Sequence, residues 1–405
     1  MVDPRTSPYT PGAGTKPLLL AGRTDELERF SVLIDRLGNR RSAEALLFAG
    51  SRGMGKTVLL HECGNRARAS GWFTAFQEVD PQHELRKVMA LNAHDVLSAM
   101  RASKRYGDRL RRALGVLKAF TSIGVLGVTL KIDVDLIPGT ADSGIFKRDL
   151  LALFTELGEI AASDGSGVVF LLDELHTLRG TEEMAGLDAV IHGMAQAGLP
   201  VTAVGAGVFR GPGYRAPGEA QTPSSYAGRL YRIVRLRPLA PEIAMQALAE
   251  PASELGVTYE EAALRLAVEF ACGSPWFLQL IGELAWEGAP SQSRITAADV
   301  RAAIPRAHAR LDDDFYPRSL GRAGFEPEGV EVLQALVALG GVGVSRDELR
   351  KRLPRSAVRE ILNYLIGQDI IEVAEARQRR YSFTVPGVSE YFERAGISSH
   401  DGPWN

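Results

Sequence analysis

The chain has 405 residues, of which 45% are hydrophobic and 24% charged, and a formal net charge of −2, values typical of a globular protein with two or three domains. No apolar run approaches the roughly 20 residues that a membrane-spanning helix needs, and the two cysteines lie far apart in no metal-ligand spacing. We therefore expect a cytoplasmic protein without membrane contact, disulfide framework or zinc site.

The N-terminal segment, residues 1–17, is rich in Pro, Gly, Ser and Thr. Such a composition cannot bury enough surface to fold alone, so we expect a flexible or adherent tail. A helix is predicted to begin at Thr24, whose hydroxyl suits an N-cap. Its apolar residues recur at helical spacing: Leu27, Phe30, Leu33, Ile34 and Leu37.

The stretch from Gly50 to Thr57 reads G-x-x-x-x-G-K-T, which is the spacing of a phosphate-binding P-loop. A short apolar run precedes it and a helical pattern follows it. Glycines at this turn let the backbone wrap an anion, so that N–H groups face the phosphates of a nucleotide. Lys56 would reach the β- and γ-phosphates, and the Thr57 hydroxyl would ligate Mg²⁺. The predicted nucleotide-binding residues of the loop are Gly50, Ser51, Arg52, Gly53, Met54, Gly55, Lys56, Thr57 and Val58.

An insertion is predicted at about residues 82–145, between the second and third strands. It contains a basic segment, residues 101–118, in which seven Lys and Arg residues are opposed by Asp108 alone. Two interpretations remain open for this segment. It is either a solvated helix face or a surface that contacts the phosphates of DNA.

A continuous apolar run at 168–172 is typical of a strand buried on both faces of a parallel sheet, and it ends in Asp173 and Glu174. The next predicted strand, 200–207, ends in Gly-Ala-Gly and has Thr202 as its only polar side chain. Strands alternating with helices predict an α/β fold with a parallel sheet and helices on both faces. The last strand lies among three arginines: Arg229, Arg232 and Arg235.

Beyond this sheet the pattern becomes helical, and we predict an α-helical lid over residues 238–310. One of its helices starts at Pro275, just after Gly273 and Ser274. A linker over 311–324 is expected to lead to a C-terminal unit, residues 325–396, and to a tail, residues 397–405.

The C-terminal unit combines three predicted helices with two short strands, an order typical of a winged helix-turn-helix. Its second helix would open with a capping box, Ser345-x-x-Glu348. The third helix would present Arg355 and Arg359 to a major groove. The turn between the strands would bring arginines to phosphates or to a minor groove, namely Arg377, Arg379 and Arg380. The alternative is a module that only packs between domains.

Together these motifs resemble AAA+ and STAND-type P-loop ATPases, with a nucleotide domain (18–237), a lid and a winged helix in the order seen in replication-initiator and archaeal-type ATPases. The resemblance implies an ATPase with ATP and Mg²⁺ as cofactors. It implies that Asp173 binds Mg²⁺, and that Glu174 orients and deprotonates the attacking water.

Weaker matches concern the residues around the nucleotide. The resemblance places Gly22 and Arg23 near the adenine, places Pro275 against it, and makes Arg229 a candidate arginine finger that acts in catalysis. AAA+ proteins carry a polar sensor at the strand tip that is Gly-Ala-Gly here, and initiator lids carry a sensor arginine where this chain has Trp276. These departures predict slow hydrolysis. His176, although close to Glu174, is given no role.

The function predicted from the sequence is an ATP-dependent molecular switch whose client is DNA, bound through the winged helix. Two alternatives remain open. The chain is a nucleotide-stabilised module that binds protein partners or itself, as in STAND-type signalling, or it is the ATPase component of a transposition or anti-phage system.

Overall fold

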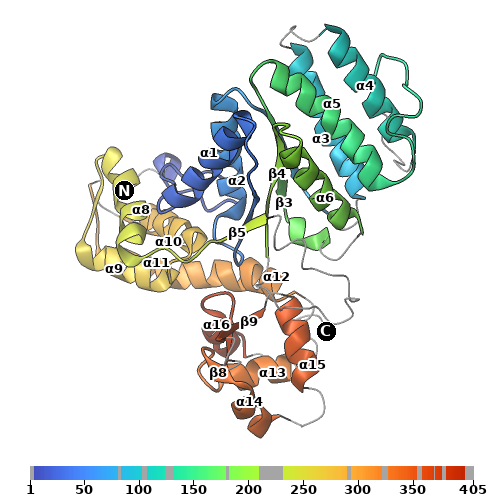
Figure 1. Ribbon diagram of the computed structural model, residues 1–405. Coiled ribbons are helices and arrows are strands. Elements are labelled where there is room, and N and C mark those ends of the chain that lie inside the picture. The colour runs from blue at the N-terminus through green and yellow to red at the C-terminus, as the bar shows by residue number, and fades with distance from the viewer. Residues whose placement is uncertain are drawn as a thin grey trace.

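The computed structural model describes residues 4–80, 84–102, 107–123, 132–178, 182–208, 231–289, 293–321, 327–353, 358–368, 370–375 and 380–396. In Figure 1 an α/β part, drawn in blue to green, stands above a helical part in yellow and orange, and a C-terminal part in orange and red lies below both. No helix in these ranges is long and apolar enough to cross a membrane.

The α/β part is built on a five-stranded parallel sheet in the order β2-β3-β4-β1-β5. Its strands are β1 (Ala45–Ala49), β2 (Phe73–Glu78), β3 (Val168–Asp173), β4 (Val201–Gly207) and β5 (Tyr231–Arg235). Every residue of β1, β3 and β4 is buried, which explains why these strands are apolar without alternation. The sheet confirms the predicted α/β class and is of the kind found in P-loop NTPases.

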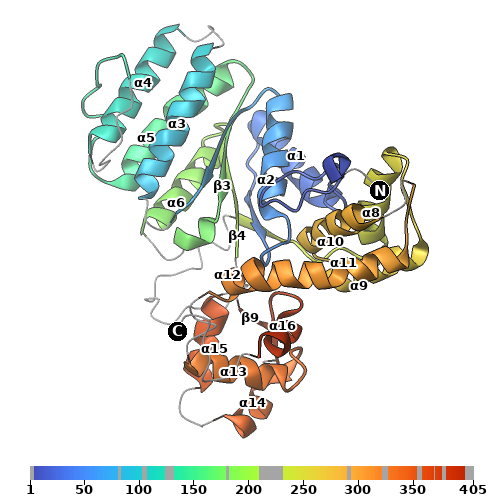
Figure 2. The ribbon, with the colours of Figure 1, turned by 180° about the vertical axis from the view of Figure 1, so that it is seen from behind.

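Helices cover both faces of this sheet (Figures 1 and 2). Alternate strand residues enter separate cores, so that Leu46 and Phe48 of β1 face one side while Leu47 faces the other. The first core includes α1 (Thr24–Gly38) and α2 (Lys56–Ala69). The second includes α3 (Leu85–Ala102), α4 (Gly107–Ser122), α5 (Phe146–Ser163) and α6 (Glu182–Gln196). Helices α3 and α4 fall in the predicted insertion.

A buried ion pair joins α3 to α5. Arg86 donates from Nη2 to Oδ2 of Asp149 at 2.8 Å, and neither side chain is appreciably exposed. The carboxylate also accepts from the backbone and hydroxyl of Ser143, while the guanidinium donates to the carbonyl of Phe120 and lies 4.6 Å from the centre of its ring. Burial alone would raise the pKa of Asp149, but the hydrogen bonds from Ser143 and Arg86 lower it below its usual value.

Replacement of Asp149 by asparagine is expected to destabilise the α/β part by about 3–5 kcal/mol, because it leaves the Arg86 guanidinium buried without a counter-charge. Urea unfolding followed by far-UV circular dichroism measures the loss. The matched control is Asp108→Asn, which removes the same charge from an exposed position on α4. A loss below about 1 kcal/mol for Asp149→Asn, the range of an exposed pair, would contradict the argument.

Four helices form the helical part: α8 (Pro241–Glu254), α9 (Glu261–Ala271), α10 (Pro275–Gly288) and α11 (Ala297–Arg310). A short parallel pair, β6 (Thr258–Tyr259) with β7 (Arg294–Ile295), joins its loops. Helix α11 runs on through a π-helical turn, Leu311–Phe315, into α12 (Tyr316–Leu320). Residues 311–320, for which we expected a linker, are therefore helical and extend α11 to the point where the C-terminal part begins (Figure 1).

The C-terminal part contains α13 (Pro327–Val337), α14 (Arg346–Arg352), α15 (Val358–Gly367) and α16 (Val388–Ala395). Strands β8 (Val344–Ser345), β9 (Ile371–Glu375) and β10 (Arg380–Phe383) form an antiparallel sheet in the order β8-β10-β9. The capping box of Ser345 and Glu348 is confirmed at the start of α14. Three helices precede the β9–β10 hairpin, as expected, and assignment to the winged-helix class stays a prediction.

The N-terminal segment adheres to the helical part. Tyr9 is buried, donates its hydroxyl to the carbonyl of Leu248 at 2.6 Å and meets the ring of Trp286 edge-on. The backbone N–H of Thr10 donates to Gln279, and Lys16 pairs with Glu62 on α2 at 2.8 Å. Of the two states that we expected, flexible or adherent, the described residues adopt the second, because Tyr9 supplies the apolar anchor.

Candidate functional site

The P-loop follows β1 directly, and α2 begins within it at Lys56. Gly53 and Gly55 have φ angles of 81° and 80°, a left-handed conformation that residues with a Cβ adopt only with strain. The Lys56 ammonium donates to the carbonyl oxygens of Gly50 at 2.9 Å and Ser51 at 3.1 Å. Loop and helix thus form the turn on which the sequence prediction depends, with the lysine folded over it.

Two predicted metal ligands meet across the sheet edge. The hydroxyl of Thr57, at the start of α2, donates to Oδ2 of Asp173, at the end of β3, over 2.5 Å. Asp173 is buried, and its other oxygen accepts from the backbone N–H of Glu174 at 2.9 Å. A hydroxyl and a carboxylate are hard oxygen donors, so these two residues fit Mg²⁺, although they are 116 positions apart in the chain.

Glu174 lies at a sharp turn, with φ of 51°, where β3 passes into a short 3-10 helix, Leu175–Leu178. Burial raises the pKa of Glu174 above its ordinary value. The charge of Lys56 opposes this rise, and that of Asp173 adds to it. A carboxylate with a raised pKa at the wall of a cavity is suited to accept a proton.

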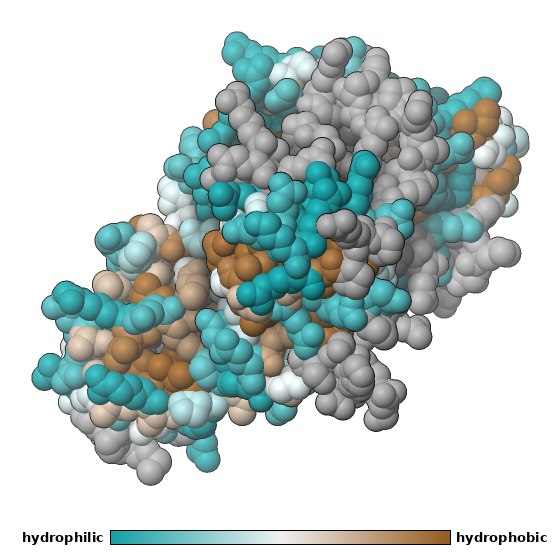
Figure 3. Space-filling view, turned by 90° about the horizontal axis from the view of Figure 1, so that it is seen from below, coloured by the Kyte–Doolittle hydropathy of each residue, from teal (hydrophilic) through white to brown (hydrophobic). Residues whose placement is uncertain are grey.

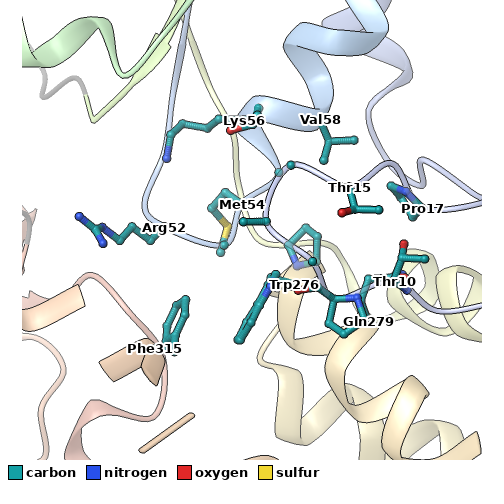
Figure 4. A pocket seen from close by; sticks show the side chains of 18 of the residues that line it. Thr10, Thr15, Pro17, Arg52, Met54, Lys56, Val58, Trp276, Gln279 and Phe315 are labelled. Carbon is teal, nitrogen blue, oxygen red and sulfur yellow. Dashed lines mark hydrogen bonds between the residues drawn. The ribbon is translucent and has the colours of Figure 1, made fainter. Parts of the chain in front are cut away.

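A cavity of about 960 Å³ lies in front of the P-loop. The N-terminal segment, the P-loop, helix α10 and the π-helical turn contribute to its wall (Figure 4). The end of β2 and Glu174, which follows β3, complete it. Its lining includes Lys56, Thr57, Glu174, Pro275 and Gln279. This volume is at the upper end of the range of small-molecule sites and accommodates a nucleotide.

The two residues expected near adenine behave differently. Arg23 lines the cavity, but it is 5% exposed and donates to the carbonyls of Met54 at 3.2 Å and Arg237 at 3.1 Å. It therefore braces the P-loop against the segment after β5. Burial lowers the pKa of Arg23, with Glu26 opposing the change. Gly22 packs against the helical part, where a Cβ would lie 2.8 Å from Ile243.

Residues missed by the sequence argument close the cavity from the helical part. The backbone N–H of Trp276 donates to the carbonyl of Gly53 at 3.3 Å, and its indole stacks on Phe315 with centroids 4.8 Å apart. Arg52 reaches further, to the carbonyl of Arg318 at 3.2 Å. In the sequence, Trp276 is distinguished only because it stands where initiator lids carry an arginine. Phe315 has no distinguishing pattern, because it meets the indole only through the π-helical turn.

The glycine-rich tip of β4 has a packing explanation. A Cβ at Gly205 would lie 2.5 Å from Leu175, and one at Gly207 would lie 2.7 Å from Nδ1 of His176. The turn after β3 therefore occupies the space in which a side chain from β4 would stand. Thr202 is the second residue of β4, pairs with Val169 and is buried, so it lies away from the tip.

Several predicted arginines lie outside the described residues, namely Arg229, Arg355, Arg377 and Arg379. Arg232 and Arg235 are exposed on β5, an edge strand, and Arg359 is exposed on α15. Arg380 donates to the carbonyl of Gly343 at 2.6 Å, a contact within the small C-terminal sheet.

Some side chains of the basic segment, residues 101–118, contact other parts of the chain. Arg112 pairs with Glu156 at 2.8 Å, and Lys118 donates to the carbonyl of Val134 at 2.7 Å. Arg109 and Arg111 are exposed on α4, whereas Lys104 and Arg105 lie outside the described ranges. Arg112 and Lys118 therefore favour the structural interpretation of this segment, and Arg109 and Arg111 keep a phosphate contact open.

Residues 19–204 match the family model of the AAA ATPase domain. Among solved structures, the fold is similar to that of the Walker-type ATPase PABY2304 of Pyrococcus abyssi, with a TM-score of 0.61 and 16% identity over 92% of this chain and 96% of that one. Fainter likenesses are to the Aeropyrum pernix ORC1 protein in complex with DNA (TM-score 0.44, 17% identity, 94% of both chains) and to the Thermotoga maritima RuvB Holliday junction branch migration motor (0.45, 15%, 95% of this chain and 98% of that one). No curated protein matches the sequence.

Proposed function

We propose that the chain, whose residues 19–204 match the model of the AAA ATPase domain, is an ATPase that acts as a nucleotide-dependent switch with the C-terminal part as its output. ATP occupies the cavity in front of the P-loop, and its hydrolysis resets the contacts between that loop and the helical part. The single observation that carries this proposal is the chain of contacts from the P-loop tip to the C-terminal part.

That chain begins at the cavity. Arg52 and Gly53 of the P-loop contact α12 and α10, and the Trp276 indole stacks on Phe315 of the π-helical turn. The next residue, Tyr316, stacks on Tyr391 of α16 with centroids 4.8 Å apart and donates its hydroxyl to the carbonyl of Pro386. A change at the P-loop tip therefore bears on the packing of the C-terminal part within a few contacts.

An ion pair also joins the π-helical turn to α16. Both oxygens of Asp312 accept from the guanidinium of Arg394 on α16, at 2.9 and 2.6 Å. Such a bidentate pair fixes orientation as well as distance. A π-helical turn within an α-helix is an uncommon feature that is frequent at functional sites, and here it carries both Asp312 and Phe315.

Four residues of this chain take part in the proposed hydrolysis of ATP. Lys56 neutralises phosphate charge, Thr57 and Asp173 hold Mg²⁺, and Glu174 orients the attacking water and takes its proton. Bound Mg²⁺ supplies charge neutralisation of the phosphate oxygens. With glycine at the tip of β4, no side chain from that strand contacts the γ-phosphate, so we propose slow turnover.

We propose DNA as the client, in a winged-helix mode. Arg359 is exposed on α15, and Arg377 and Arg379 follow β9 in the sequence. Exposed apolar side chains keep the alternative of a protein partner open. The C-terminal part exposes Val342 by 79%, Val373 by 39% and Tyr364 by 38%. Figure 3 shows hydrophobic and hydrophilic residues intermixed on the face seen from below. Exposed apolar groups of this kind suit protein contacts when they gather into a patch.

Salt-dependent binding of a DNA duplex in the presence of ATP distinguishes these clients. Arg359 and Arg379 replaced together by alanine should weaken binding and lower the slope of log affinity against log salt by about one per lost phosphate contact. Fluorescence anisotropy of a labelled duplex gives both values, and Arg29→Ala, an exposed residue on α1, serves as the matched control. A wild-type chain without salt-sensitive DNA binding would favour the protein-partner alternative.

A further inference from the structure

The strongest unassigned feature near the site is the imidazole of His176. Its Nδ1 atom lies 3.3 Å from Oε2 of Glu174, and it belongs to the short helix that follows the turn at Glu174. Glu174 is one of three non-glycine residues with positive φ in the described part of the chain. Such backbone strain persists only where the surrounding contacts hold it, and it clusters at active sites.

The space for this imidazole comes from a glycine on a different strand. A Cβ at Gly207 would lie 2.7 Å from Nδ1 of His176 and 3.2 Å from both its Cβ and its backbone nitrogen. Gly207 pairs with Ala49 of β1, and its carbonyl accepts from the N–H of Gly50 at 3.3 Å. The tip of β4 is thus fixed beside the P-loop, and any larger residue there would displace the imidazole.

We propose that His176 is a positioning residue: a small rotation of the imidazole turns the 3.3 Å contact of Nδ1 into a hydrogen bond to the Glu174 carboxylate, which holds this carboxylate at the wall of the nucleotide cavity. Gly207 is the complementary half of this arrangement, because it leaves the space for the ring. The inference rests on the proposed role of Glu174 as the base. The tip of β4 carries no polar side chain near the base. In this proposal His176 supplies that polar group, and Gly207 leaves the space for it.

The cavity lining agrees with an indirect role. Glu174 and Thr177 are among the lining residues and His176 is not. Its Nδ1 is buried and lies within ion-pair distance of Glu174, although the contact does not meet hydrogen-bond geometry. The N–H of Thr177 donates to the carbonyl of Glu174 at 3.0 Å, which closes the turn around the base. Loss of the imidazole should therefore alter the direction of the carboxylate and leave the nucleotide-binding surface in place.

The experiment measures kcat for ATP and nucleotide affinity separately. His176→Ala should lower kcat by about 10- to 100-fold, the cost of a base misplaced by about 1 Å, while nucleotide affinity stays within about 2-fold. His176→Asn should recover part of kcat, since the asparagine amide can donate from nearly the same place as Nδ1. A merely structural histidine would change the unfolding temperature without this split between kcat and affinity.

Gly207→Ala tests the same contact from the other side, because it fills the space that the imidazole occupies. It should lower kcat by displacing the imidazole, and the double variant with His176→Ala should turn over no more slowly than His176→Ala alone. The two single effects are then not additive, because both remove the same contact. Thermal unfolding of each variant shows that it is folded, and if Gly207→Ala does not fold, the His176 variants still decide the matter.

Glu174→Gln, measured in parallel, keeps the two proposals apart. If Glu174→Gln loses turnover while His176→Ala keeps kcat within 2-fold of wild type, the positioning role is overturned and the role of Glu174 stands. If Glu174→Gln turns over like wild type, Glu174 is not the base and the positioning role is overturned with it. A fall in kcat for both variants, with partial recovery in His176→Asn, supports the proposal.

Discussion

Replacement of Lys56 by alanine is expected to abolish ATP binding at concentrations that saturate the wild type, a loss of at least about 100-fold in affinity. The physical reason is the removal of the buried ammonium that pairs with the β- and γ-phosphates, since charge-assisted contacts are worth about twice a neutral hydrogen bond. Titration with a fluorescent ATP analogue measures the effect. The glycine turn and helix N-terminus remain in the variant, but without the lysine they no longer compensate four phosphate charges.

Two further measurements make the Lys56 result specific. Lys147→Ala removes the same charge from an exposed position on α5 and should bind ATP like wild type. Because the Lys56 ammonium also bonds to the carbonyls of Gly50 and Ser51, the unfolding temperature of Lys56→Ala must be compared with that of wild type. A folded Lys56→Ala variant with unchanged nucleotide affinity would refute the P-loop assignment.

The second large effect is expected for Glu174→Gln, which should bind ATP normally but hydrolyse it about 10²-fold more slowly, or worse. The amide keeps the size and shape of the side chain, and it cannot take a proton from water. Phosphate release at saturating ATP measures turnover. The position is favourable for this role because Glu174 lines the cavity next to Asp173, which shares a hydrogen bond with Thr57.

Glu159→Gln is the matched control for this variant, since Glu159 is exposed on α5 and lies in a different element. It should leave turnover within about 2-fold of wild type, as most surface substitutions do. Glu174→Gln should also lengthen the lifetime of bound ATP and so trap the nucleotide-bound form. Persistent turnover in Glu174→Gln would move the role of base to another carboxylate that lines the cavity, such as Glu78 or Asp80.

The P-loop, the strand that ends in Asp173 and Glu174, and the parallel sheet could all be predicted from the sequence. Each of these is a local pattern with one physical cause. Glycines at fixed spacing are needed for a left-handed turn, and a run of apolar residues is needed for a strand buried on both faces. The capping box at Ser345 is also a short-range pattern.

Only the tertiary structure revealed the side-chain contacts between distant elements that surround these motifs. Arg86 with Asp149, Trp276 with Phe315, and His176 with Gly207 join residues that are 31 to 63 positions apart and carry no shared pattern. Arg23 and the tail anchor Tyr9 likewise acquire partners only when distant elements pack. Local propensity and periodicity specify which element a residue joins, whereas the partner of a side chain depends on how whole elements pack, because a few ångströms decide each contact.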